Sequence, residues 1–93
     1  MVALNKKYEI EMTLEFLVDA LNTNRELEFR SDGRLYFAEP ETNPPFPTHY
    51  GIWDVETHTC VFAGDIDRML DFLFPSGKSL RKDFDTFDFL YIY

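Results

Sequence analysis

The stretch with the clearest structural signal is ELEFRSDGRLYFA, which runs from Glu26 to Ala38. The part from Glu26 to Arg30 alternates charged with apolar side chains, which is the period of a strand with one buried and one hydrated face. Asp32 and Gly33 follow, and both residue types tolerate the positive φ angles of a tight primed hairpin turn. Leu35 to Ala38 is the expected return strand, so the sequence predicts a β-hairpin here.

Apolar residues at helical spacing predict helices on both sides of the strands. The first helix is expected to begin after the N-cap Thr13 and to end at the polar run Asn22–Asn24. The second is expected to be capped by Asp65 and to carry an apolar stripe from Ile66 to Leu73. A short third helix is expected between Ser79 and about Phe87, with the serine as its cap.

Three further segments complete the predicted architecture. Tyr50–Val55 and Thr59–Ala63 are rich in β-branched and aromatic residues and favour a second hairpin. Phe89–Tyr93 is apolar on both faces, which is typical of a strand inside a sheet or at a covered edge. Glu39–Thr48 contains four prolines and is predicted to be a surface loop pinned by Phe46.

The resulting element order is α-β-β-β-β-α-α-β. It predicts an α+β fold in which helices lie on one face of an antiparallel sheet of four to five strands. The chain has 93 residues, and 45% of them are hydrophobic. These values favour a single small globular domain over residues 1–93 and argue against disorder.

Chain length and cysteine content bound the expected location. The apolar run Phe89–Tyr93 is far shorter than the roughly 20 residues that span a bilayer. The start, Met1 to Lys7, has no apolar stretch of the kind that a signal peptide needs. The lone Cys60 has no internal disulfide partner. We therefore expect a cytoplasmic protein that does not bind membranes.

No catalytic motif stands out. His58 and Cys60 are two residues apart and, with His49, suggest a metal or nucleophile site, whereas tetrahedral zinc needs three or four ligands. Acidic pairs such as Asp65 with Asp67 could hold a divalent cation only if several converged, and nothing in the sequence requires that. Gly77-Lys78-Ser79 resembles the end of a phosphate-binding loop, but Phe72 stands where that motif needs a glycine. The sequence therefore predicts no enzyme, no metal and no cofactor. A small metal-dependent hydrolase using the histidines, Cys60 and nearby carboxylates stays open as an alternative.

The distribution of charge is more informative. The chain carries 17 acidic and 9 basic side chains, a formal net charge of −8. No lysine or arginine occurs between Arg34 and Arg68, so negative potential is expected over the second hairpin and second helix. The predicted partner-binding surface comprises Glu39, Glu41, Trp53, Asp54, Glu56, Asp65, Asp67 and Asp71. High net charge also serves solubility alone, and this interpretation stays open.

Several positions also resemble a known group of proteins. They are Arg25 to Phe29, Gly33, Tyr36, Asp65-Ile66-Asp67 with Leu70, and Gly77 to Leu80. The pattern resembles that of small uncharacterised α+β proteins of Gram-positive bacteria, their phages and mobile elements, and it covers about Met12 to Ile92. The resemblance implies no particular activity, and the long Pro-rich loop departs from it. Some acidic phage proteins of similar size inhibit bacterial defence nucleases, anti-CRISPR proteins among them, and this is an analogy of size and charge.

These observations together predict a non-enzymatic acidic interaction protein. In its most specific form, this prediction is of a phage or mobile-element inhibitor that mimics nucleic acid. Such an inhibitor would dock on a basic protein, such as a nucleic-acid-binding enzyme. Direct nucleic-acid binding is disfavoured, because duplex affinity depends on lysine and arginine. The alternative is a structural or assembly protein that self-associates through the aromatic strand Phe87–Tyr93. A monomer or weak homodimer is expected.

Overall fold

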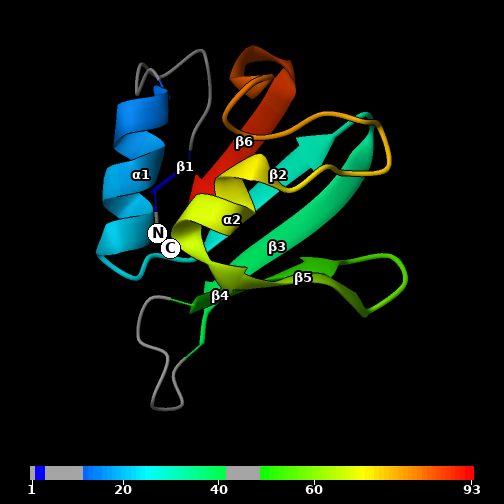
Figure 1. The fold of residues 1–93 in the computed structure, drawn as a ribbon, viewed down its shortest axis with the longest axis horizontal. Coiled ribbons are helices and arrows are strands. Elements are labelled where there is room, and N and C mark those ends of the chain that lie inside the picture. The colour runs from blue at the N-terminus through cyan, green and yellow to red at the C-terminus, as the bar shows by residue number, and fades with distance from the viewer. Residues whose placement is uncertain (1, 4–11, 42–48) are drawn as a thin grey trace.

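A computed structural model of the chain describes residues 2–3, 12–41 and 49–93. The elements are β1 (Val2–Ala3), α1 (Leu14–Asn22), β2 (Leu27–Ser31), β3 (Arg34–Pro40), β4 (His49–Asp54), β5 (Thr59–Asp65), α2 (Ile66–Asp71), the 3₁₀ turn η1 (Phe84–Thr86) and β6 (Phe87–Ile92). All strand pairs are antiparallel, in the order β1-β6-β2-β3-β4-β5 (Figure 1). The predicted α+β class and element order are confirmed. The structure adds one strand to those predicted, the two-residue β1 at one edge of the sheet.

The β2–β3 hairpin forms as the sequence predicts. Asp32 and Gly33 have φ angles of 55° and 80°, and Ser31 and Arg34 pair directly on either side of them. Both central residues therefore have the positive φ of a primed two-residue turn, whose twist matches that of the flanking strands. At Gly33 the backbone conformation is what requires glycine, because a Cβ would meet nothing within 4 Å.

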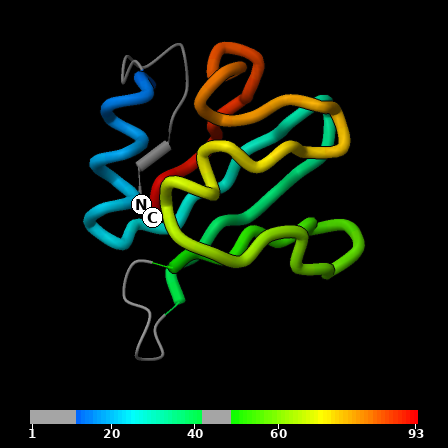
Figure 2. The backbone as a smooth tube through the Cα atoms, viewed as in Figure 1, coloured from blue at the N-terminus to red at the C-terminus, as the bar shows by residue number. Residues whose placement is uncertain are grey.

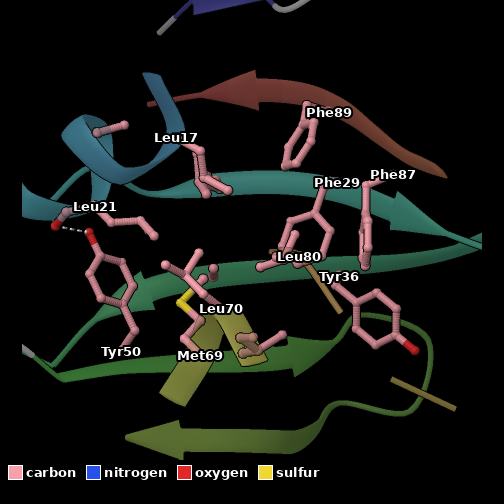
Figure 3. Packing of buried hydrophobic residues seen from close by; sticks show 14 of the residues in the cluster. Leu17, Leu21, Phe29, Tyr36, Tyr50, Met69, Leu70, Leu80, Phe87 and Phe89 are labelled. Carbon is pink, nitrogen blue, oxygen red and sulfur yellow. Dashed lines mark hydrogen bonds between the residues drawn. The ribbon is translucent and has the colours of Figure 1, made fainter. Parts of the chain in front are cut away.

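The helices lie on one side of the sheet, as expected. Figures 1 and 2 show α2 and the segment of residues 72–86 crossing this side, with α1 at its other end. Alternate strand residues point toward them and form the core, together with Leu17, Leu21, Met69 and Leu80 from the covering segments (Figure 3). The core strand residues include Leu27, Phe29, Tyr36, Ala38, Tyr50, Ile52, Phe87 and Phe89. A sheet with one buried face leaves the alternate side chains on the other.

Tyr50 fastens the end of α1 to the sheet. Its hydroxyl donates to the backbone carbonyls of Leu21 at 2.9 Å and of Arg25 at 3.0 Å (Figure 3 draws the first bond). The first carbonyl belongs to the last turn of α1 and the second to the segment that follows the helix. Burial, with a smaller contribution from Glu26, raises the pKa of Tyr50 to about 12. The hydroxyl therefore stays protonated and can donate at any physiological pH.

The second helix is shorter than its apolar stripe predicts. It ends at Asp71, and Phe72 has extended backbone angles of −61° and 131°. Leu73, expected on the buried stripe, is instead 65% exposed. The extended backbone carries Phe74 into the core, where its ring lies 4.9 Å from that of Tyr36. Aromatic packing at Phe74 therefore outweighs the helical spacing of Leu73.

The helix predicted for Ser79 to Phe87 is also shorter. The Ser79 Oγ accepts from the Lys82 amide at 3.2 Å, and the Asp83 carboxylate accepts from the Ser79 amide at 3.0 Å. The serine thus caps a single turn, as its residue type favours. Only η1 follows, because Phe87 already belongs to β6 and packs in the core.

The strand ends differ slightly from the prediction. Strand β3 continues to Pro40, so the start of the predicted Pro-rich loop pairs with β4. The rest of that loop, residues 42–48 with Phe46, lies outside the described residues. Strand β6 pairs with β2 on one side and with β1 on the other. The prediction of a C-terminal strand inside the sheet is confirmed.

Candidate functional site

Asp54 has a structural position. Its side chain points to the helix-covered face, opposite Tyr36, and the residue is 5% exposed. One carboxylate oxygen forms an ion pair with Arg34, and the other accepts from the amides of Glu56 at 3.0 Å and Thr57 at 3.2 Å. The prediction that Asp54 offers a free charge to a partner is therefore wrong. It joins the start of β3 to the turn between β4 and β5.

This arrangement makes stability depend on pH. The hydrogen bond from Arg34, together with the two turn amides, lowers the pKa of Asp54. A lowered folded-state pKa contributes stability above the unfolded value of about 4, and this contribution is lost as pH falls through the folded-state pKa. We expect Asp54→Asn to lower the urea midpoint at pH 7 and the difference from wild type to narrow below about pH 4. Equilibrium unfolding across pH checks this.

The matched control is Asp85→Asn, which removes one carboxylate at an exposed position. Its urea midpoint should follow that of the wild-type chain across the same pH range. An Asp54→Asn curve that stays parallel to wild type down to acidic pH would contradict the structural role of the ion pair.

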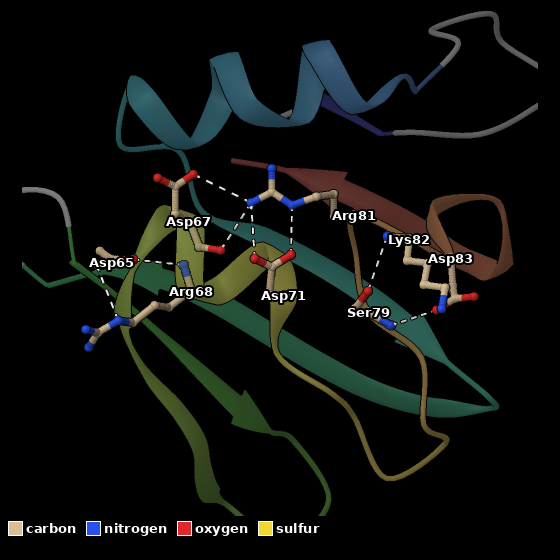
Figure 4. A network of polar contacts seen from close by, with 8 residues as sticks. All are labelled: Asp65, Asp67, Arg68, Asp71, Ser79, Arg81, Lys82 and Asp83. Atoms are coloured by element: carbon tan, nitrogen blue, oxygen red, sulfur yellow. Dashed lines mark hydrogen bonds and ion pairs between the residues drawn. The ribbon is translucent and has the colours of Figure 1, made fainter.

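Three other predicted carboxylates, on and before α2, also have cationic partners (Figure 4). Asp71 Oδ1 lies 2.8 Å from Arg81 Nε, and Asp67 Oδ1 lies 3.6 Å from Arg81 Nη2. Asp65 caps α2 by accepting from the Arg68 amide at 2.8 Å, and its other oxygen lies 3.8 Å from Arg68 Nε. Arg68, within α2, and Arg81, from a later segment, therefore neutralise much of the acidic surface that the sequence predicts here.

The remaining predicted residues lie elsewhere. Glu56 is exposed in the turn between β4 and β5. Glu39 is on β3 and Glu41 directly follows it, with the Glu41 amide donating to the His49 carbonyl at 2.8 Å. Trp53 is on β4 and is 38% exposed. Glu39, Glu41 and Trp53 all lie near one face of the sheet.

This face is the one opposite the helices. Because Phe29, Tyr36 and Ile52 point into the core, the alternate residues of the same strands point away from it. Glu28 lies between Phe37 on β3 and Tyr91 on β6, and Phe37 in turn lies opposite Trp53. We name the acid–aromatic face by its residues, which are Glu26, Glu28, Phe37, Glu39, Glu41, Trp53, Tyr91 and Tyr93.

The aromatic rings of this face are close to one another and to its carboxylates. The ring centroids of Phe37 and Tyr93 are 5.9 Å apart, and those of Tyr91 and Tyr93 are 6.1 Å apart. Burial first, and then the charges of Glu28 and Glu26, raise the pKa of Tyr93. Both carboxylates therefore act on the phenol at the chain end.

Gly51 gives the Trp53 indole room at the other end of the face. A Cβ on Gly51 would lie 3.4 Å from Trp53 Nε1 and 3.9 Å from Glu41 Oε1. The indole nitrogen and this carboxylate thus converge above a residue without a side chain. Glu39 lies directly across from Gly51 on β3. The Trp53 ring and the Glu41 carboxylate thus lie near Gly51, and Glu39 is its cross-strand neighbour.

The carboxylates of the acid–aromatic face have no cationic partner among the described residues. The Arg25 Nε instead donates to the Tyr93 carbonyl at 2.7 Å. Arg30 is in the adjoining row, opposite Asp88. Glu26 directly precedes Leu27, and Glu39 directly follows Ala38, the residue that pairs with Leu27. Four carboxylates of this face therefore keep uncompensated charge close to its aromatic rings.

Sequence reasoning missed five residues of this face: Glu26, Glu28, Phe37, Tyr91 and Tyr93. The available signal was the hydrated half of the alternating pattern from Glu26 to Arg30. That pattern was used to find the core, although it also defines what the opposite face presents.

The histidines and cysteine do not converge. His58 lies in the turn between β4 and β5 with a φ of 55°, so it does not share a strand face with Cys60. Cys60 is exposed on β5. No group of three or more histidine, cysteine or acidic side chains in the described ranges could hold a metal ion.

Comparisons with protein-family models, with curated proteins and with solved structures found no match for this chain. The resemblance to small proteins of Gram-positive bacteria and their phages therefore stays a prediction. Within residues 2–3, 12–41 and 49–93, no helix is long and apolar enough to cross a membrane.

Proposed function

We propose that the chain is a non-enzymatic interaction protein that binds a basic protein through its acid–aromatic face. The observation that carries this proposal is the contrast between two groups of carboxylates. Those of Asp54, Asp67 and Asp71 are bound by arginines, whereas those of the acid–aromatic face have no such partner among the described residues. A basic partner is the complement of an uncompensated acidic surface.

The aromatic residues add the second property of a binding surface. Trp53 and Tyr93 are among the large hydrophobic side chains that stay exposed. Tryptophan and tyrosine are enriched among the residues that dominate binding energy, and arginine from a partner can stack on their rings. Charge would steer the partner to the face, and the rings would anchor it.

The same chemistry favours a protein partner over nucleic acid. Phosphates would meet glutamates here, and duplex affinity needs lysine or arginine at the contact. A basic groove that normally holds nucleic acid would offer a suitable partner. In that form the chain acts as an inhibitor that competes for the groove, the role suggested by its size and charge.

The proposal is tested by capture with two charge-matched variants. The face variant carries Glu→Gln at positions 26, 28, 39 and 41. The control carries Glu15→Gln, Asp19→Asn, Asp32→Asn and Asp85→Asn, all at exposed positions. Each set removes four negative charges, so the formal net charge changes from −8 to −4 in both. Wild type and both variants are immobilised and exposed to lysate of a Gram-positive bacterium at low ionic strength.

We expect basic proteins that are retained by wild type and by the control, are lost from the face variant and elute with salt. The captured protein is then purified and titrated against all three chains by calorimetry. Equal loss from both variants would mean that net charge alone causes retention, and the proposal would fail. Retention by all three chains would contradict it equally.

A further inference from the structure

Strand β5 forms one edge of the sheet. It pairs with β4 along its length, and no strand follows it in the sheet order of the described residues (Figure 1). The backbone groups on its outer side therefore have no ladder partner in this part of the chain. An edge of this kind is a template for another strand.

This edge has few of the features that usually prevent pairing. Residues 59–64 read TCVFAG, with no charged residue and no proline. Thr59, Cys60 and Ala63 are exposed. Natural edge strands are commonly protected by lysine, proline or inward-pointing charges. One protective feature is a bulge in β5 itself, because the consecutive β4 residues Ile52 and Trp53 pair with Phe62 and Cys60 and leave Val61 over.

The two ends of β5 carry opposite charges. Glu56 lies in the turn before the strand and is exposed; it forms no ion pair within the described ranges, although its charge helps to raise the pKa of Arg34. Arg68 lies in α2 after the strand; its Nε is 3.8 Å from Asp65 Oδ2, and its side chain is nevertheless 81% exposed. Phe62 is the midpoint of β5, and Glu56 and Arg68 are equally far from it in sequence. If β5 of a second copy paired antiparallel with this strand, with Phe62 opposite Phe62, the Glu56 turn of each chain would lie beside Arg68 of the other.

We propose that β5 pairs antiparallel with β5 of a second copy, extending the two sheets into one across a twofold axis. The contact is isologous, with two Glu56–Arg68 ion pairs at its ends. It differs from assembly through β6, which already has β1 and β2 as neighbours. Because each copy carries a net charge of −8, the dimer should be weak and form at high protein concentration.

The first test is sedimentation velocity of the full chain over a wide range of protein concentration. We expect a reversible monomer–dimer equilibrium. Arg68→Glu should raise its dissociation constant about tenfold, because each pair becomes a like-charge contact. The double variant Glu56→Lys with Arg68→Glu restores opposite charges and should restore the wild-type constant. Circular dichroism confirms that each variant is folded.

The second test uses the single cysteine of the chain. A nitroxide on Cys60 gives one label per copy, so pulsed dipolar spectroscopy detects only distances between copies. In the proposed register the two Cys60 Cα atoms are offset by four residues, a separation of about 14 Å. A short label distance at high concentration supports the pairing. A monomer at all concentrations, a dimer insensitive to Arg68→Glu, or only long label distances would overturn it.

Discussion

Replacing Phe29 with alanine is expected to lower the free energy of unfolding by about 3–5 kcal/mol. Phe29 is fully buried at the centre of the core (Figure 3). Its ring centroid lies within 5.8–6.0 Å of those of Tyr36, Phe74, Phe87 and Phe89. These neighbours come from β3, β6 and the segment after α2. The cavity left by truncating Phe29 would therefore weaken the packing of all three segments. Urea unfolding followed by tryptophan fluorescence measures the change.

The control for this prediction is Leu73→Ala, since Leu73 is 65% exposed. It removes an apolar side chain that has little buried area to lose, so we expect a change within about 0.5 kcal/mol. Comparable losses from the two variants would contradict the core described above. A small domain has a total stability of only about 5–15 kcal/mol, so Phe29→Ala is measured with added stabilising osmolyte.

Replacing Trp53 with alanine is expected to weaken binding of the basic partner about a hundredfold, with little change in stability. A central tryptophan commonly contributes at least 2 kcal/mol to a protein interface, and a hundredfold change corresponds to about 2.7 kcal/mol. Trp53 lies beside Glu41 on the acid–aromatic face and is 38% exposed. Its ring is therefore available to a partner while it is anchored on the sheet. Calorimetric titration of the captured partner measures the loss.

Phe16→Ala is the matched control for this substitution. Phe16 is 40% exposed, almost the same fraction as Trp53, but it lies on α1. Truncating it should leave the affinity for the partner unchanged. Equal losses from both variants would show that general surface hydrophobicity, and not this face, determines binding.

Local sequence signals predicted most of the fold. Alternation, the Asp32-Gly33 turn and the caps Thr13 and Asp65 act over a few residues, and each is confirmed. The errors arise where distant contacts override local spacing. Leu73 continues the helical stripe of α2, but the helix ends because Phe74 packs against Tyr36, a residue far away in the chain.

The candidate site was harder to predict for the same reason. Arg34 and Asp54 are 20 residues apart, and Arg81 and Asp71 are 10 apart. A count of charges along the chain shows no cation near Asp54 and only Arg68 near Asp71, yet the fold pairs these carboxylates with Arg34 and Arg81. Glu28, by contrast, looks balanced by its neighbours Arg25 and Arg30 in sequence. The strand places it between Phe37 and Tyr91, without a cationic partner in the described part of the chain.

The central claim is that uncompensated negative charge is concentrated on the acid–aromatic face. It is tested most directly by NMR, comparing the paramagnetic relaxation that a cationic and an anionic nitroxide of the same size cause at each proton. The ratio reports the local potential without any partner. We predict that the cationic probe is most enriched around Glu28, Phe37 and Trp53, with a ratio nearer neutral around Asp71 and Arg81. The claim is contradicted if the cationic probe is most enriched around α2 and Asp54 and the ratio is neutral around the acid–aromatic face.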